Sequence, residues 1–568
     1  MKNTLVHKEP VSSPAAAMPV KPAKRSISPV RKAGTILAGA AALTALCWAC
    51  HVHAAIDVLP YDDGYITFRY VDNCVNGKGL VYNPGQRVFG SSTPLYTLLL
   101  VAARCITNTP TPELAVRLNL VPFIACGVGI WLLILRYTGS HILGLLGAAA
   151  FLVDPFMLSR STGGMEPFLF GAFMLAAMWA MSGGNRPVLA GVLIGLAILT
   201  RPEGVLLVPI AILAYRRSLK TILKSAAAAG AIVLPWVIFA FAYYGTPIPL
   251  SIIAKAKPVY PLATGEGLSD LIQWTVLWAT AFRWESLREL RVILVIDVVL
   301  LGTIACLLCG EYRRRGAWMP SAFFWLMVVF YALGNPLVFE WYHPLFWLPA
   351  MLAMMTALPA AGHLLRERLV LRNWTRLSAA VMPAMFAITA IWLCGAGEER
   401  YRCVREDLRQ HFTDAPFVLV NNDSRRLRVL GYKQAAERMN RYTTDRTVIA
   451  APEIGALGYY SNARILDACG LVSPEAHPFL PVPESRRSGP RTGSIGANLI
   501  KALAPDYVVS MPVFATDSLL LPQKDGTMKL CNDDYEIVDQ VKLPAPAWGD
   551  DMILIFRKKA TVATPSSN

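Results

Sequence analysis

Two adjacent carboxylates follow the first long apolar stretch of the chain. Asp62 and Asp63 open the run Asp-Asp-Gly-Tyr-Ile-Thr-Phe-Arg-Tyr, directly after the apolar segment 33–59. Holding two negative charges together at a membrane surface is costly, because each disfavours ionisation of the other. Either side chain could accept a proton from a hydroxyl that attacks a substrate arriving through the lipid. A helix N-cap with one solvated carboxylate is the alternative that the pair leaves open.

The composition of the 568-residue chain predicts a polytopic membrane protein. Hydrophobic residues make up 54% of the sequence, charged residues only 16%, and the mean hydropathy is +0.43. A net charge of +16 would suggest nucleic-acid binding in a soluble chain. Here the basic residues lie in short clusters between apolar stretches, which is typical of cytoplasmic loops. We therefore expect a lipid bilayer, and no nucleic acid, as a partner.

The apolar stretches predict about eleven membrane crossings, since a spanning helix needs ~20 apolar residues. Residues 1–33 are rich in Pro, Ser, Lys and Arg, which predicts a disordered basic cytoplasmic tail. The segment 33–59 reads as an uncleaved anchor or a signal peptide, and its length favours the anchor. The other crossings are expected at 114–136, 142–158, 167–181, 188–200, 205–215, 225–244, 292–309, 318–333, 344–359 and 377–394.

The basic clusters orient these crossings. With the N-terminus inside, every cluster falls on the cytoplasmic side, namely Arg136, Arg186, 216–220, 313–315 and 366–376. The same alternation places Asp62, Asp63 and everything after Cys394 outside the cytoplasm. Counting 93–105 as a crossing would reverse every later loop, so this stretch is expected to lie along the membrane surface. The amphipathic pattern of 65–76 predicts a second interfacial helix.

The composition changes after Cys394, where charged residues return and short apolar runs alternate with helical patterns. Strands are expected at 417–420, 447–450, 507–509 and 552–555, and a helix at 432–442. A region of about 170 residues can bury its own core. We therefore expect a membrane domain over residues 34–395, followed by an extracytoplasmic α/β domain over 396–568.

The first outer loop resembles that of the GT-C membrane glycosyltransferases, through residues 62–70 (DDGYITFRY) and 76–88 (NGKGLVYNPGQRV). Within that superfamily the pattern is similar to cell-wall arabinofuranosyltransferases that use decaprenylphosphoryl arabinofuranose. A later element at 162–166 (TGGME) is similar to a Ser-Gly-(Leu/Met)-Glu element of those enzymes, with Gly at the usual Ser position. The resemblance continues at 199–204 (LTRPEG) and 454–460 (IGALGYY).

The resemblance implies a GT-C-like catalytic membrane domain and an enzyme of the bacterial inner membrane. It would move a single sugar from a polyprenyl phosphate to an extracytoplasmic acceptor hydroxyl, through an oxocarbenium-like state. Arabinofuranose is favoured, and mannose, aminoarabinose or another sugar stays open. Asp62 or Asp63 would act as the base, with Glu166 as a third catalytic candidate. No cofactor is required by this scheme, although adjacent carboxylates could hold a divalent ion.

The leaving phosphate needs cations, and an arginine suits this task because its planar guanidinium binds phosphate oxygens in pairs. Each cation of the outer loops could instead be an interfacial residue or the partner of an acid. The candidates for donor binding are Arg69, Arg160, Arg201, Lys255, Lys257 and His343. Arg201 could also form a buried structural pair with Glu203. Tyr459 and Tyr460 could stack on an acceptor sugar, or be core aromatics.

Other classes of protein remain open at this point. A flippase or transporter of a lipid-linked sugar predicts acids near the bilayer midplane, and only Asp154 and Asp297 lie well inside expected crossings. A transferase of whole glycans fits less well, because the C-terminal region is modest in size. A scaffold would leave Asp62 and Asp63 replaceable. The acceptor could be a cell-wall glycan, a lipid or a protein.

Overall fold

The computed structural model describes most of the membrane half and most of the C-terminal region. The described residues are 29–55, 59–183, 186–256, 265, 267–269, 288–336, 338–368, 424–483, 495–523, 528–547 and 550–560. The crossing expected at 377–394, the strand at 417–420, Lys257 and most of the tail 1–33 lie outside these residues. Residues 29–33, which the composition assigns to the tail, belong to α1, which begins at Pro29, and proline is favoured in the first turn of a helix.

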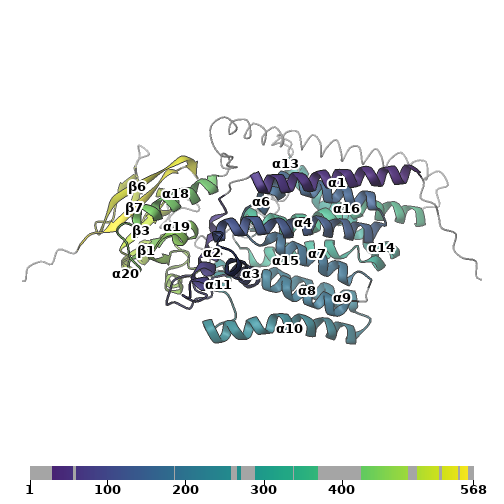
Figure 1. The fold of residues 1–568 in the computed structure, drawn as a ribbon, viewed down its shortest axis with the longest axis horizontal. Coiled ribbons are helices and arrows are strands. Elements are labelled where there is room, and N and C mark those ends of the chain that lie inside the picture. The colour runs from purple at the N-terminus through teal and green to yellow at the C-terminus, as the bar shows by residue number, and fades with distance from the viewer. Residues whose placement is uncertain are drawn as a thin grey trace, which may run out of the picture.

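Apolar helices form a bundle in the membrane half. Four of them are long and apolar enough to cross a membrane within the described residues, in α1 (Pro29–Ala55), α4 (Thr111–Thr138), α10 (Leu219–Tyr244) and α16 (His343–Arg368). In Figure 1 these helices run in a similar direction, with α1 and α10 at opposite edges. Their positions agree with the predicted crossings.

Shorter helices fill the bundle. They are α5 (His141–Val153), α6 (Pro155–Ser161), α7 (Pro167–Met181), α8 (Pro187–Thr200), η1 (Pro202–Leu206), α9 (Leu207–Tyr215), α13 (Arg288–Leu308), α14 (Gly310–Arg315) and α15 (Met319–Gly334). The chain folds back between α8 and α9 at Gly204. A Cβ on Gly204 would lie 2.5 Å from the Ile198 nitrogen, so this turn needs a glycine.

Several smaller elements gather at the end of the bundle that faces the C-terminal region (Figure 1). They are α2 (Asp62–Val75), α3 (Pro94–Ile106) and α11 (Leu250–Ala256). The short η3 (Glu340–Tyr342) reaches α11 through a hydrogen bond between Tyr342 and Lys255. The helix expected at 65–76 is α2, but it does not lie half-exposed on a membrane surface. Every residue from Gly64 to Val71 is buried, and on the face that the pattern assigned to solvent Asp72 accepts a hydrogen bond from Tyr459 of the C-terminal region.

The described residues of the C-terminal region form a mixed sheet of five strands in the order β2-β1-β3-β7-β6. Strands β2 (Arg464–Asp467) and β3 (Tyr507–Ser510) run parallel to β1 (Val448–Ala451), whereas β7 (Asp550–Lys558) and β6 (Tyr535–Ala547) continue antiparallel. β1, β3 and β7 lie where strands were expected, and the helix expected at 432–442 is α18 (Ser424–Met439). The remaining elements are α19 (Gly455–Tyr460), η4 (Pro474–Phe479), α20 (Ala497–Leu503), α21 (Pro512–Ala515), β4 (Leu520–Pro522) and β5 (Met528–Leu530).

One hydrophobic core joins the first outer loop to the C-terminal region. Tyr65 and Phe68 of α2 lie in the same buried cluster as Tyr432 of α18, Ile449 of β1 and Leu457 of α19. The sheet region therefore does not complete its core alone on this side. Helix α2 packs into it as an additional element, which places the two N-terminal residues of α2 at the junction between the two halves.

Candidate active site

The Asp62 carboxylate is bound by the C-terminal region. Its Oδ2 accepts a hydrogen bond from the Gly455 nitrogen at 2.9 Å, and its Oδ1 accepts one from the Ala456 nitrogen at 2.8 Å. These N–H groups begin α19, so Asp62 acts as the N-terminal cap of a helix that lies far away in the sequence. Burial raises the pKa of Asp62, and the two N–H bonds and the charge of Arg428 act in the opposite direction.

Asp63 has a different environment, although it is the next residue. Within the described part of the chain, its carboxylate makes no hydrogen bond to another residue. Burial raises the pKa of Asp63 to about 6, with Lys255 and Arg428 lowering it and Asp62 and Glu166 raising it. A carboxyl group that titrates near neutrality and can still accept a hydrogen bond has the properties of a general base.

Lys255 of α11 provides the cation of this site, and Tyr342 of η3 holds it. The Lys255 ammonium donates a hydrogen bond to the Tyr342 hydroxyl at 2.9 Å and lies 5.5 Å from the centroid of the same ring. Lys255 and Asp63 act on each other electrostatically. The pair therefore places a positive charge, held by a tyrosine, within electrostatic range of the Asp63 carboxylate.

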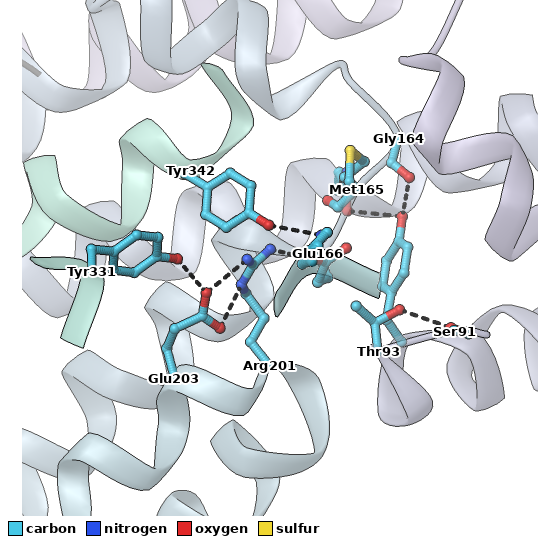
Figure 2. Close-up of polar contacts among 12 residues, drawn as sticks. Ser91, Thr93, Gly164, Met165, Glu166, Arg201, Glu203, Tyr331 and Tyr342 are labelled. Carbon is cyan, nitrogen blue, oxygen red and sulfur yellow. Dashed lines mark hydrogen bonds and ion pairs between the residues drawn. The ribbon is translucent and has the colours of Figure 1, made fainter. Parts of the chain in front are cut away.

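A buried ion network lies next to Tyr342 (Figure 2). Arg201 Nη1 lies 2.5 Å from Glu166 Oε1, while its Nη2 and Nε donate to the two oxygens of Glu203 at 2.9 and 3.2 Å. The Tyr331 hydroxyl donates to Glu203 Oε1 at 2.7 Å. Glu166 and Arg201, both named as site residues from the sequence, are thus engaged with each other. The Arg201–Glu203 pair considered above is present and buried.

The 162–166 element lies directly against the residues that precede Asp62. The Tyr96 hydroxyl donates to the Gly164 carbonyl at 2.9 Å, and Asn119 Nδ2 donates to the Met165 carbonyl at 2.8 Å. A Cβ on Gly163 would lie 2.4 Å from the Tyr61 ring. Gly163, which stands at the usual Ser position of the Ser-Gly-(Leu/Met)-Glu element, therefore lies where the Tyr61 ring leaves little room for a side chain.

The other predicted cations have diverse surroundings. Arg69 is buried in α2, where its guanidinium donates to the carbonyls of Tyr82, Gly458 and Ala463 and to Asn83 Oδ1. These bonds leave it at most one N–H for a ligand. Arg160 is buried at the end of α6, and the buried His343 ring stacks on Trp347 at a centroid distance of 6.2 Å. Of the cations named from the sequence, Lys255 is the one that the described geometry brings into electrostatic contact with Asp63.

Tyr459 and Tyr460 face α2 rather than an open surface. Their ring centroids lie 5.5 and 5.7 Å from that of Tyr65, and the Tyr459 hydroxyl donates to Asp72 Oδ2 at 2.7 Å. Asp72 also accepts a hydrogen bond from Thr111 of α4. Both tyrosines are half-buried, so their contacts in this structure hold α19 against α2.

Sequence reasoning missed the residues that reach this junction from α18. Arg426 Nη2 donates to the Ser159 carbonyl at 3.2 Å and to Thr162 Oγ1 at 3.3 Å. Arg428 forms an ion pair with Glu453, and its charge lowers the pKa of both Asp62 and Asp63. The sequence signal for these residues was the group of three arginines within 424–428 (SRRLR). Basic residues are frequent throughout the C-terminal region, so this group did not stand out.

A divalent ion would have to be held largely by Asp63. Both Asp62 oxygens accept backbone N–H bonds, so the adjacent pair does not present the set of free oxygens that Mg²⁺ or Ca²⁺ prefers. The described residues contain no group of three His, Cys, Asp or Glu side chains placed to hold a metal ion.

The fold is that of a polytopic helical membrane protein with an α/β region at one end of its helix bundle. ArnT from Cupriavidus metallidurans, solved in the apo state, shares this fold with a TM-score of 0.50 and 15% identity, over 94% of this chain and 100% of that chain. Residues 421–559 match a domain of unknown function (DUF8728).

Two sequence relatives are named terminal beta-(1->2)-arabinofuranosyltransferase. The one from Mycobacterium tuberculosis is 27% identical over 220 residues, and the one from Corynebacterium glutamicum is 26% identical over 261 residues. The matches cover 34% and 38% of this chain, and 34% and 36% of the relatives, so they span only about a third of those proteins. The predicted resemblance to this group is confirmed.

Proposed function

We propose that this protein is a membrane glycosyltransferase that moves a single sugar from a polyprenyl phosphate donor to an extracytoplasmic acceptor hydroxyl. The named relatives favour arabinofuranose as that sugar. The observation that carries the proposal is the environment of Asp63. Its carboxylate has a pKa raised to about 6, has no hydrogen-bond partner among the described residues, and lies within electrostatic reach of Lys255.

In the proposed reaction, the acceptor oxygen attacks the anomeric carbon of the donor, and the bond from that carbon to the phosphate oxygen breaks. Asp63 takes the proton of the attacking hydroxyl. The polyprenyl phosphate leaves with the bonding electron pair, and the Lys255 ammonium stabilises its negative charge. Tyr342 holds the ammonium in place through its hydroxyl and ring.

The buried ion network has a supporting role in this scheme. Glu166 touches Arg201 rather than standing free, and it acts on Asp63 through its charge, which raises the pKa of that carboxyl. A raised pKa brings the base closer to neutrality, where proton transfer from a hydroxyl is most effective. Arg69 supports α2 through its bonds to main-chain carbonyls.

The test is incubation of the purified full-length protein with a panel of polyprenylphosphoryl sugars, followed by measurement of released polyprenyl phosphate. We expect release from the arabinofuranose donor in the presence of an acceptor, and much less with Asp63→Asn. Release from a mannose or aminoarabinose donor instead would change the sugar and keep the reaction class. If donor crosses the bilayer of proteoliposomes without any release, the protein is a flippase and the proposal fails.

A further inference from the structure

Helices α2 and α19 touch with almost no space between their backbones. A Cβ on Gly455 would lie 1.8 Å from the Asp62 carbonyl oxygen, and a Cβ on Gly458 would lie 1.8 Å from the Tyr82 hydroxyl. A backbone oxygen cannot move as a flexible side chain does, so position 455 admits only glycine in this arrangement. Gly455 therefore permits the close approach of α19 to α2, and Gly458 permits that of α19 to Tyr82.

Several hydrogen bonds fasten the same contact. The Asp62 carboxylate accepts the first two N–H groups of α19 from positions 393 and 394 residues away in the sequence. The Tyr82 hydroxyl donates to the Ile454 carbonyl at 2.5 Å, and Arg69 donates to the Gly458 and Ala463 carbonyls. Every one of these bonds joins the first outer loop to the C-terminal region.

Asp63 depends on this contact for its position. Its own carboxylate has no hydrogen-bond partner in the described part of the chain, so its direction follows from the backbone of the first turn of α2. That turn is anchored by the neighbouring Asp62 side chain. A misplacement of about 1 Å at a reacting group can cost up to about 100-fold in rate, so the anchor matters for chemistry.

We infer that Asp62 is a positioning residue rather than a second base, and that the C-terminal region sets the geometry of the catalytic carboxylate by binding Asp62 through α19. This inference rests on the proposed function, in which Asp63 is the base. Under this inference the Asp62 carboxylate binds the C-terminal region, and the Asp63 carboxylate contacts the substrate.

The test compares kcat and donor KM for four variants of the full-length protein. Asp62→Ala should lower kcat about 10- to 100-fold with little change in KM, because the base is displaced. Asp62→Asn should lie between the unchanged protein and Asp62→Ala, because the amide oxygen still accepts one of the two α19 N–H bonds, whereas the NH2 group cannot accept the other. Gly455→Ala adds one methyl group without any titratable change and should lower kcat like Asp62→Ala. Gly496→Ala is the matched control, because its Cβ would meet Val482 at an ordinary 3.6 Å.

A double-mutant cycle gives the decisive comparison. Asp62→Ala combined with Gly455→Ala should be no slower than the slower single variant, because both changes break one contact. The inference is wrong if the two effects multiply, or if Asp62→Asn is as slow as Asp62→Ala, as expected for a base. Neither Asp62 variant adds bulk at the contact, so their comparison decides the matter even if Gly455→Ala does not fold.

The same variants distinguish a failure of this inference from a failure of the proposed function. A slow Asp63→Asn with a fully active Gly455→Ala would overturn only the role of the contact. A fully active Asp63→Asn would overturn the proposed base itself, whatever the Asp62 variants do.

Discussion

Arg201 and Glu166 form an ion pair, 2.5 Å between Nη1 and Oε1, in which both side chains are more than nine-tenths buried. Because Glu203 binds the same guanidinium, one arginine compensates two buried carboxylates. The network carries an excess negative charge at the ends of α7 and α8. After burial itself, the charge of Glu166 contributes to the raised pKa of Asp63.

Removing Arg201 should destabilise the fold strongly. Arg201→Met leaves Glu166 and Glu203 buried without a cation, and loss of one partner from a buried pair costs about 3–5 kcal/mol. Thermal unfolding in detergent should show a clear loss of stability. Arg117→Met is the control, because its pair with Glu113 is exposed, and we expect a change within about 0.5 kcal/mol. An Arg201 variant as stable as this control would contradict the structural role.

Asp63→Asn should reduce transfer and stabilise the fold at the same time. Loss of a positioned base costs on the order of 100-fold in kcat. The pKa of Asp63 is raised from 3.8 to about 6, so ionisation disfavours the folded state at neutral pH. The neutral amide should therefore add on the order of 1 kcal/mol at pH 7.5, an advantage that shrinks as the pH falls from about 6 to about 4. Thermal unfolding at pH 7.5 and pH 4.5 measures this difference, and an equal advantage at both values would argue against a raised pKa.

The pH dependence of kcat/KM should report the same carboxyl group. Activity should fall about tenfold per unit below pH 6, where Asp63 becomes protonated. Lys255 and Arg428 lower its pKa, whereas Asp62 and Glu166 raise it. Lys255→Met should accordingly move the acidic inflection to higher pH, besides weakening phosphate binding. An inflection that moves to lower pH would separate Lys255 from Asp63.

The orientation of the chain can be tested independently of activity. Reporter fusions at Lys32 and Arg314 should report a cytoplasmic location, and a fusion at Arg400 should report the opposite side. A cytoplasmic signal at Arg400 would place Asp63 and the C-terminal region on the wrong side for an extracytoplasmic reaction.

The apolar helices could be predicted because a bilayer imposes length and composition on each span. Helices α4 and α10 lie close to their expected bounds for this reason. Asp62 and Asp63 were also recognised as site candidates, but the sequence did not show that Asp62 binds α19 while Asp63 has no such partner among the residues that the structure describes. The partners of Asp62 are main-chain N–H groups, which every residue type except proline carries and which leave no signal in the sequence.

Arg69 illustrates the same limit. Its place in an outer loop favoured phosphate binding, whereas in the structure its acceptors are mostly main-chain carbonyls from two distant segments. The expectation that residues 396–568 bury their own core did not include α2, because the short amphipathic pattern of 65–76 is equally typical of a membrane-surface helix. Only the tertiary contact with α18 and α19 distinguishes the two environments.

The long sequence separation across the α2 contact has a consequence for biosynthesis. Helix α2 leaves the ribosome early, while Gly455 follows 393 residues after Asp62. At about 5–20 residues per second, this delay amounts to tens of seconds. Tyr65 and Phe68 then lack their final partners, and Asp63 lacks its anchor. Under the proposed function, nascent chains should therefore be inactive until the C-terminal region has been synthesised and has folded against α2.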